Sequence, residues 1–416
     1  MKYNQYLVFV LSIISSLFPR ISSKNCFAPV EYRKITNQNS NCDKLIDYKV
    51  SDYTDKENDI NAKNIQHDCL HLNAYRDVNE TQSLKATSDC KKKNRFDGTY
   101  SYKGMSLDND TDDYLNSAKF SGSITEDKDK GGELNYLEGT TGGFIAATNA
   151  PIGDFRITAE EFKTECSFNL IHTKKCFSGN FIQQLDTSND KNTKFEKDNT
   201  VLDFYKALKK HKIKYVVMLT NFVEKSTDED CTCKVKADRY FPDKVREILK
   251  LSNPDYTPSK LTVETTTLQV KEYGDTTETR NLKFTDNTDN SSHEVTHYHY
   301  KKWIDFSVPK DDDLKQLFKL IAHIRKKKDA GENIIVHCTG GIGRTGTFIS
   351  SVLTSNLQAD KKFNLITFIL KLREKRPEFV ETDKQVELII ENIKQTMTPT
   401  RASNKLKMKL MKRKKL

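Results

Sequence analysis

The chain has 416 residues, of which 36% are hydrophobic and 30% are charged, and its mean hydropathy is −0.70. This length allows one large enzyme domain with additions or a few average domains, and the hydropathy excludes a protein with many membrane spans. The 17 Tyr and 22 Phe exclude a wholly disordered chain. The net charge of +10 is compatible with a nucleic-acid binder, but residues 1–23 and 401–416 carry all of this excess, and between them 58 basic residues face 58 acidic ones. We therefore expect no nucleic-acid partner.

The first 23 residues are typical of a signal peptide. Lys2 precedes an apolar run at residues 6–18, and a polar stretch with small residues ends at Ser23. The run is shorter than the about 20 apolar residues that a membrane-spanning helix needs. We expect cleavage after Ser23 and a secreted protein, with a membrane anchor made by an uncleaved signal as the alternative.

Residues 24–84 form a Cys-containing N-terminal extension with no other recognisable pattern. The chain has nine cysteines, and eight of them can form disulfide bonds in an oxidising compartment. These eight are Cys26, Cys42, Cys69, Cys90, Cys166, Cys176, Cys231 and Cys233. Asn79, Asn109 and Asn290 begin glycosylation sequons in polar stretches. We expect a disulfide-bonded glycoprotein in which Cys338 is the remaining thiol.

Two later segments show clear secondary-structure patterns. In residues 282–300, a polar turn at 286–292 separates two β-rich runs, which predicts a hairpin. In the next segment, apolar residues recur at helical spacing before three lysines, which predicts a helix with one face in the core. These residues are Leu314, Leu317, Phe318, Ile321 and Ile324.

A β-rich apolar run at 334–336 leads into a glycine-dense loop, and a helical pattern follows at 347–353. Glycines at 340, 341 and 343 allow backbone N–H groups to converge on one anion. The N-terminus of the following helix adds positive potential at the same place. The pattern predicts a phosphate-binding cradle between a strand and a helix.

Cys338 opens this loop and Arg344 closes it. The positive field favours the thiolate form of the cysteine, and the guanidinium can hold an oxyanion with two hydrogen bonds. A thiolate at the base of a phosphate cradle is a nucleophile aimed at phosphorus. The alternative is a buried structural cysteine beside a glycine-rich turn.

The last segment, residues 399–416, is a basic tail. Such a tail is usually solvated, and it can also bind an anionic surface such as lipid or a sulfated glycan. We expect a solvated tail, with an anionic-surface contact as the alternative. The sequence gives no indication of the oligomeric state.

The segment from His337 to Gly346 resembles the signature of the protein tyrosine phosphatases, in which His-Cys, a loop of five residues and Arg form the active site. Other segments are similar to that family in the same order along residues 85–398. They are residues 93–96, 114–118, 144–151, 203–205, 216–220, 240–242, 297–309 and 376–385. The resemblance implies an α/β fold: one phosphatase-like domain at 85–398, with a highly twisted mixed β-sheet flanked by α-helices. It also implies a polar insertion at about 154–200.

The resemblance further implies a role for each matching residue. Cys338 attacks phosphorus while Arg344 holds the phosphate oxygens. Asp305 gives a proton to the leaving phenolate, contacts the substrate, and later takes a proton from water. The hydroxyl of Thr345 stabilises the departing thiolate, and His337 supports the loop rather than acting as a base. No metal or cofactor is expected.

The substrate site and the water site follow from the same resemblance. The cradle consists of Thr339, Gly340, Gly341, Ile342 and Gly343. Phe96 walls a deep slot suited to phosphotyrosine in protein substrates. Gln385 and Glu381 occupy the segment that positions the hydrolytic water. Glu224 matches a glutamate that orients Arg344, with an ordinary surface glutamate as the alternative.

Several residues depart from the family pattern. Ile304 replaces a proline in the loop that carries Asp305, and Gly98 lies where many members have a substrate-anchoring aspartate. Glu381 replaces the glutamine that places the water, and its carboxylate would repel bound phosphate. We therefore expect slow hydrolysis of the phosphocysteine and a pre-steady-state burst that Glu381→Gln removes.

Two functions follow from these residues. The first is a secreted phosphatase that hydrolyses phosphotyrosine through a phosphocysteine intermediate. The alternative is a catalytically weak or inactive pseudophosphatase that binds phosphotyrosine, motivated by Ile304, Gly98 and Glu381. The joint presence of Cys338 and Asp305 favours the first, because a protein that only binds phosphotyrosine needs no general acid.

Overall fold

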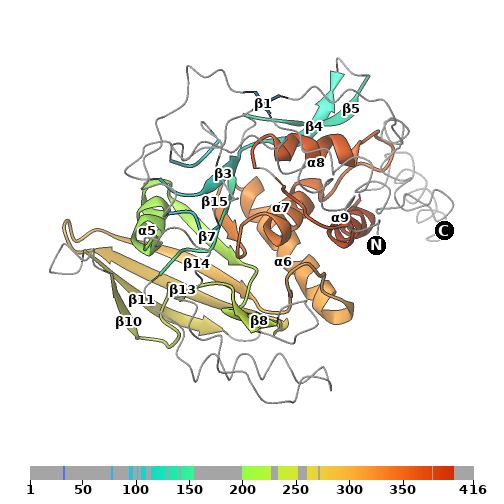
Figure 1. The fold of residues 1–416 in the computed structure, drawn as a ribbon. Coiled ribbons are helices and arrows are strands. Elements are labelled where there is room, and N and C mark those ends of the chain that lie inside the picture. The colour runs from blue at the N-terminus through green and yellow to red at the C-terminus, as the bar shows by residue number, and fades with distance from the viewer. Residues whose placement is uncertain are drawn as a thin grey trace, which may run out of the picture.

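The computed structural model describes residues 31–32, 76–77, 93–96, 101, 105–108, 114–128, 131–139, 142–153, 199–225, 233–251, 260–269, 272–376 and 378–397. Within them, eight strands form one mixed sheet (Figure 1). In sheet order the strands are β10 (Ile248–Leu251), β11 (Leu261–Gln269), β13 (Thr277–Asp286), β14 (Ser292–Tyr300), β7 (Ile213–Met218), β15 (Asn333–His337), β6 (Ile145–Thr148) and β3 (Ser117–Phe120).

The sheet has an antiparallel part and a parallel part. β10, β11, β13 and β14 are antiparallel neighbours, whereas β14, β7, β15 and β6 run parallel, and β3 closes the edge antiparallel to β6. The central strand β15 is buried over Ile334, Ile335 and Val336, as expected for a strand covered on both faces. Ligands in open α/β sheets bind at the carboxyl ends of the parallel strands, so we expect a ligand site at the carboxyl end of β15.

Helices cover both faces of the sheet. α5 (Val201–Lys210) packs on one face, where Phe204 and Leu208 join a core with Val216 and Ile335. The other face is covered by α6 (Asp311–Asp329), α7 (Gly343–Thr354), α8 (Leu365–Arg373) and α9 (Asp383–Thr396). Figure 1 shows α5 on one side of the sheet and the four later helices grouped on the other.

Local sequence explains where these helices begin. α6 has three aspartates in its first turn and three lysines in its last turn, which complement the helix dipole. The side chain of Asn364 caps α8 by accepting a hydrogen bond from the N–H of Thr367. Thr382 and Gln385 form a reciprocal capping box at the start of α9.

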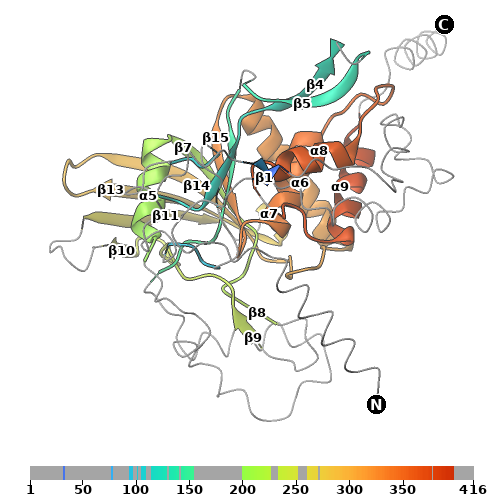
Figure 2. The same ribbon diagram turned by 45° about the horizontal axis from the view of Figure 1, so that its top comes forward.

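Short strand pairs lie outside the main sheet. β4 (Ser123–Asp127) and β5 (Glu133–Leu137) form an antiparallel ribbon beside α8, as Figure 2 shows. β8 (Val223–Lys225) pairs with β9 (Cys233–Val235), and β1 (Glu31–Tyr32) pairs with β2 (Arg76–Asp77). β12 (Glu272–Asp275) precedes β13.

The fold class predicted from the sequence is confirmed: the domain is α/β, with a large mixed sheet flanked by helices. The hairpin predicted over residues 282–300 is formed by β13 and β14, and the predicted helix is α6, in which Leu317, Phe318, Ile321 and Ile324 are buried. The strand and helix around the cradle are β15 and α7. α7 begins at Gly343, one turn before its apolar pattern, so that Arg344 lies within the helix.

Several predictions fall outside the described residues. These are the signal peptide at 1–23, nearly all of the extension at 24–84, nearly all of the insertion at 154–200, the tail at 399–416, and the sequons at Asn79 and Asn109. Asn290 lies in the exposed turn between β13 and β14. Among the described helices, none combines the length and the apolar character that crossing a bilayer requires.

Candidate active site

Cys338 lies at the base of a loop between β15 and α7. Its side chain is buried and is a free thiol, and the N–H of Gly341 donates to its Sγ at 3.3 Å. Gly341 has a φ of 72°, and a Cβ there would lie 2.1 Å from the carbonyl oxygen of Thr148 on β6. Only glycine fits this position, and its conformation turns an N–H group toward the sulfur.

Arg376 holds the outer side of the loop. Its Nε donates to the carbonyl oxygen of Gly341 at 2.5 Å and its Nη2 to that of Gly340 at 2.8 Å. Burial lowers the pKa of Arg376 to about 10, against the raising effect of Tyr114 and Cys338. With the carbonyl oxygens turned outward, the N–H groups face inward and form a nest for an anion. The sequence placed Arg376 in a matching segment but did not predict this contact.

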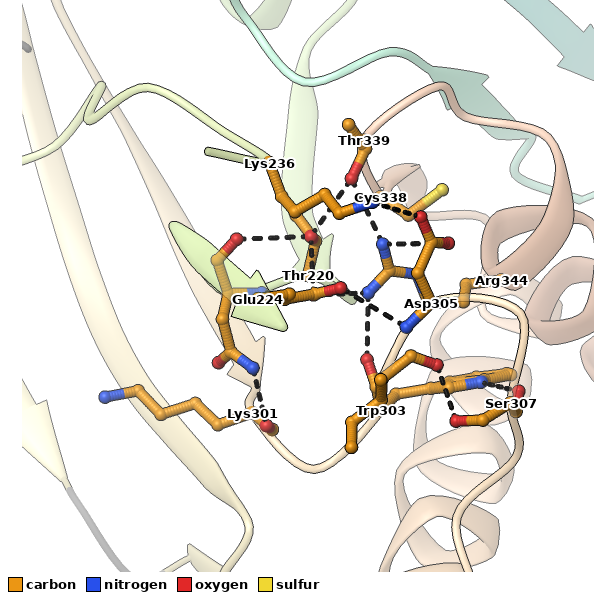
Figure 3. A network of polar contacts seen from close by, with 12 residues as sticks. Thr220, Glu224, Lys236, Lys301, Trp303, Asp305, Ser307, Cys338, Thr339 and Arg344 are labelled. Atoms are coloured by element: carbon orange, nitrogen blue, oxygen red, sulfur yellow. Dashed lines mark hydrogen bonds and ion pairs between the residues drawn. The ribbon is translucent and has the colours of Figure 1, made fainter. Parts of the chain in front are cut away.

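Arg344 is fully buried beside the loop (Figure 3). Its Nη1 donates to Oε1 of Glu224 at 2.5 Å and to the carbonyl oxygen of Trp303 at 2.8 Å, and its Nη2 donates to Oγ1 of Thr339 at 3.1 Å. Burial opposes the charge of Arg344, but Glu224 and Asp305 outweigh it and raise its pKa. The guanidinium is therefore charged and fixed in orientation before any ligand binds.

Glu224 on β8 orients this arginine from a buried position with 1% exposure. Its Oε1 also accepts from Oγ1 of Thr220 at 2.9 Å and from the N–H of Asn221 at 3.0 Å. Its Oε2 accepts from the N–H of Asp305 at 3.2 Å. The surface alternative for Glu224 is therefore wrong, because this carboxylate joins β8 to the loop that carries Asp305.

Asp305 lies over the site with its carboxylate directed at two cations (Figure 3). Oδ1 is 3.2 Å from Nη2 of Arg344, and Oδ2 is 2.7 Å from Nζ of Lys236. Burial raises the pKa of Asp305, but Arg344 and Lys236 outweigh it, so the net shift is downward. Without a ligand the carboxylate is ionised, and a bound phosphate dianion would offset Arg344 and favour its protonation.

The loop around Asp305 is anchored by Trp303, which is fully buried and donates from Nε1 to the carbonyl oxygen of Ser307 at 2.7 Å. Ile304 and Phe306 flank Asp305 and are 48% and 50% exposed. The replacement of proline by Ile304 therefore does not prevent this loop from lying over the cradle.

His337 lies behind the loop in a buried chain of polar groups. Its Nε2 is 2.6 Å from the hydroxyl of Tyr240, which is 2.7 Å from Nε2 of His297, and its Nδ1 is 3.2 Å from the carbonyl oxygen of Cys338. Burial lowers the pKa of His337 to about 4, with smaller contributions from Arg95 and Arg344. A neutral, fully bonded imidazole supports the loop, as the sequence suggested.

Glu381 and Gln385 approach the cradle from the start of α9. A Cβ on Gly343 would lie 1.9 Å from Oε2 of Glu381 and 3.0 Å from Nε2 of Gln385. Burial raises the pKa of Glu381 to about 7, helped by Asp305 and Glu378 and opposed by Arg344 and Arg373. The two side chains predicted to place water thus meet at the first residue of α7.

The remaining predicted residues lie around the same loop. Arg95 donates to the carbonyl oxygens of Ala150 and Pro151 and pairs with Asp238 at 2.6 Å, which anchors the segment that carries Phe96. Phe96 is 47% exposed, and its ring lies within 3.5 Å of the position that a Cβ on Gly340 would occupy.

Thr345 and Ile342 complete the set of predicted residues. Ile342 precedes α7 and lies against Gly340. The Thr345 hydroxyl is buried and has no hydrogen-bond partner within the described part of the chain. The carboxylate of Asp305 thus meets Arg344 beside the loop of Cys338, and Thr345 lies in the first turn of α7.

No cluster of His, Cys, Asp and Glu side chains suited to a metal ion occurs among the residues that the structure describes. The chemistry available is that of a thiol in an anion nest, a fixed guanidinium and a carboxylic acid.

Comparisons with known proteins agree with the family resemblance found in the sequence. The family model for the protein-tyrosine phosphatases matches residues 184–395. Over 200 residues the chain is 30% identical to Tyrosine-protein phosphatase 2 of Dictyostelium discoideum, covering 45% of this chain and 46% of that protein. It is 28% identical over 198 residues to chicken receptor-type tyrosine-protein phosphatase eta, covering 45% of this chain and 12% of that protein.

A third relative is human receptor-type tyrosine-protein phosphatase H, which is 30% identical over 188 residues, or 45% of this chain and 15% of that protein. The chain spans less than half the length of these curated relatives. The family match covers half of the chain and contains both Cys338 and Arg344. The chain belongs to the protein-tyrosine phosphatase family.

Proposed function

We propose that this protein hydrolyses phosphotyrosine in protein substrates through a phosphocysteine intermediate. The observation that carries the proposal is the closed arrangement of the site, in which Asp305 lies 3.2 Å from Arg344 above the free thiol of Cys338. The side chains proposed as acid, oxyanion holder and nucleophile thus lie around one loop, which supports the proposal. A protein that only bound phosphotyrosine would need neither the acid nor the buried thiol.

In the first step the substrate phosphate enters the nest and takes over the contacts of Arg344 with Asp305. The thiolate of Cys338 attacks phosphorus in line, and Arg344 with the loop N–H groups holds the equatorial oxygens. Asp305, protonated once phosphate offsets Arg344, gives its proton to the leaving phenolate. The products of this step are free tyrosine hydroxyl and a phosphoryl group on sulfur.

In the second step water attacks the phosphoryl group opposite the sulfur. Asp305, now ionised, takes a water proton, and the P–S bond breaks to regenerate the thiolate. Thr345 has an uncommitted buried hydroxyl near the first turn of α7 and would stabilise that thiolate. Glu381 and Gln385 would place the water, and Glu381 is the group expected to make this step slow.

The exposed ring of Phe96 supports phosphotyrosine as the substrate, because a ring beside the cradle can wall a slot deep enough for a phenyl phosphate. Phosphoserine is too short to reach a thiol at the base of such a slot. The relatives named above are called tyrosine-protein phosphatases. By similarity to them, we propose phosphotyrosine-containing proteins as the substrates of this chain.

The test is hydrolysis of a phosphotyrosine peptide by the purified full-length protein. We expect Cys338→Ser to abolish turnover and Asp305→Ala to lower kcat by about 10²–10⁴-fold, with a smaller loss for aryl phosphates whose phenols are acidic. Turnover unaffected by either change would exclude this mechanism. Tight phosphopeptide binding without turnover would instead establish the pseudophosphatase alternative.

We also propose that the protein enters the secretory pathway and loses residues 1–23. The phosphatase domain would then span residues 85–398 with the insertion at about 154–200, preceded by the extension at 24–84 and followed by the basic tail at 399–416. N-terminal sequencing of the exported protein tests the cleavage after Ser23. Intact protein retained in membranes would favour the uncleaved anchor.

A further inference from the structure

Two side chains converge on the first residue of α7, beside the phosphate cradle. Gly343 leaves room there because it has no Cβ, which would lie 1.9 Å from Oε2 of Glu381 and 3.0 Å from Nε2 of Gln385. The carboxyl group of Glu381 and Nε2 of Gln385 therefore meet at Gly343, the last glycine of the cradle.

The amide of Gln385 is held in one orientation. Its Oε1 accepts from the N–H groups of Glu381 at 2.8 Å and Thr382 at 3.3 Å as part of the capping box of α9. Its Nε2 is buried and has no partner among the residues that the structure describes. A buried donor left without a partner is costly, and a bound water would satisfy it.

The charges around Glu381 favour its neutral form. Burial, Asp305 and Glu378 raise its pKa to about 7, and Arg344 and Arg373 oppose this. A phosphoryl group on Cys338 would add more negative charge on the same side and raise the pKa of Glu381 further. A protonated carboxyl group has the same shape as a glutamine amide and, like it, offers one donor group and one acceptor oxygen.

We propose that Glu381 positions the hydrolytic water in its protonated form, together with Gln385, so that release of phosphate from Cys338 depends on that proton. This inference rests on the proposed function and concerns only its second step. Glu381 acts here as a positioning residue, since Asp305 remains the base.

In the hydrolysis of the phosphocysteine, Gln385, Glu381 and Asp305 each make one hydrogen bond to the attacking water. The water accepts a hydrogen bond from Nε2 of Gln385, donates one to the carbonyl oxygen of protonated Glu381 and donates the other to Asp305. Its remaining lone pair attacks phosphorus as the P–S bond breaks, and the electron pair of that bond returns to Cys338. One water proton moves to Asp305, Glu381 keeps its own proton, and the product is inorganic phosphate.

The ionised form of Glu381 cannot hold this arrangement. Three negative groups (the phosphoryl group, Asp305 and Glu381) would then meet around one water, and their repulsion favours movement of the carboxylate toward Arg373. The water loses an acceptor and the step slows. Phosphate release is therefore fast below the pKa of Glu381 and slow above it.

The test follows the covalent intermediate directly. Rapid-quench measurements with a radiolabelled phosphotyrosine peptide give the rate at which protein-bound phosphate forms and the rate at which it decays, from about pH 5.5 to about pH 8.5. In the wild type we expect the decay rate to be constant at low pH and to fall above about pH 7, approaching a tenfold decrease for each pH unit beyond the pKa of Glu381 in the phosphoenzyme. The burst should grow over the same range.

Two variants make the result specific to Glu381. Glu381→Gln keeps the shape of the neutral carboxyl group, and we expect its decay rate to vary by less than about twofold across the range, with no burst at about pH 8. Glu378→Gln is the matched control, because it removes an exposed carboxylate from the same segment. It should keep the pH dependence of the wild type, with the midpoint at slightly lower pH.

Three outcomes would overturn the inference. A decay rate that rises with pH would make ionised Glu381 a base, and a flat wild-type profile would show that its proton does not matter. An unchanged slope in Glu381→Gln would assign the titration to another group. In each case an intermediate still forms on Cys338 and the proposed function stands, whereas absence of any covalent phosphate would contradict both.

Discussion

The contact between Glu224 and Arg344 is buried on both sides, with side-chain exposures of 1% and 0%. Removing one partner of a buried ion pair leaves a charge without compensation, which costs more than the pair itself contributes. We expect Glu224→Gln to lower the free energy of unfolding by about 3 kcal/mol and kcat/KM by more than tenfold. Denaturant unfolding and steady-state kinetics measure the two effects.

The matched control for this prediction is Glu387→Gln, which removes an exposed carboxylate on α9. It should leave the free energy of unfolding within about 0.5 kcal/mol of the wild type and should not change the kinetics. Equal effects of the two substitutions would show that Glu224 does not orient the arginine.

The site residues that could be predicted from the sequence are those that lie close together in the chain. Cys338, the cradle glycines and Arg344 lie in one short segment, so their spacing alone predicted an anion nest and a nucleophile. Arg376 and Lys236 act through contacts with residues 35 and 69 positions away. A lysine in a lysine-rich chain carries no local signal, and neither contact could be predicted without the fold.

At the scale of elements, the hairpin of β8 and β9 carries two groups to the site. Glu224 lies on β8, and Lys236 follows β9 and reaches Asp305 at 2.7 Å. The sequence did not predict this hairpin, because each strand has only three residues and residues 226–232 separate them. α5, α8 and α9 were likewise not predicted as helices, whereas α6 was, because apolar residues recur at helical spacing from Leu314 to Ile324.

Lys236→Met tests the electrostatic role of this hairpin. Lys236 and Arg344 lower the pKa of Asp305 against the effect of burial, so removing the ammonium group should raise that pKa. A general acid must carry its proton, and the alkaline limb of the kcat/KM profile should therefore move to higher pH. The value of kcat/KM near its optimum should fall, because a contact that holds the loop closed is lost.

The control is Lys234→Met, which changes an exposed lysine on β9. Its pH profile should match that of the wild type. If Lys236→Met left the alkaline limb in place or moved it to lower pH, Lys236 would not be acting on Asp305.

At the scale of the whole molecule, the site joins segments from both ends of the phosphatase domain. Five segments that are far apart in the sequence surround the end of β15. They are the segment of Phe96, strand β6, the hairpin of β8 and β9, the loop of Asp305 and the start of α9. The order of strands, in which β7 lies between β14 and β15, is not readable from local patterns, since it depends on long-range pairing. The family resemblance, and not periodicity, implied this assembly.

Because so many segments meet at one anion nest, a bound oxyanion should stabilise the domain as a whole. At about 100 times its dissociation constant, vanadate should add about 2.7 kcal/mol to the free energy of unfolding. We expect Arg344→Ala to abolish this gain and the exposed Arg246→Ala to keep it. A gain that survives Arg344→Ala would place the anion elsewhere.

The central claim is that Cys338 carries the phosphoryl group during hydrolysis of phosphotyrosine. Rapid quenching of the enzyme with a labelled phosphotyrosine peptide, followed by peptide mapping, tests it most directly. We predict one covalently bound phosphate on the peptide that contains Cys338, and neither label nor turnover in Cys338→Ser. Turnover that persists in Cys338→Ser, or hydrolysis with no phosphate on this cysteine, would contradict the account.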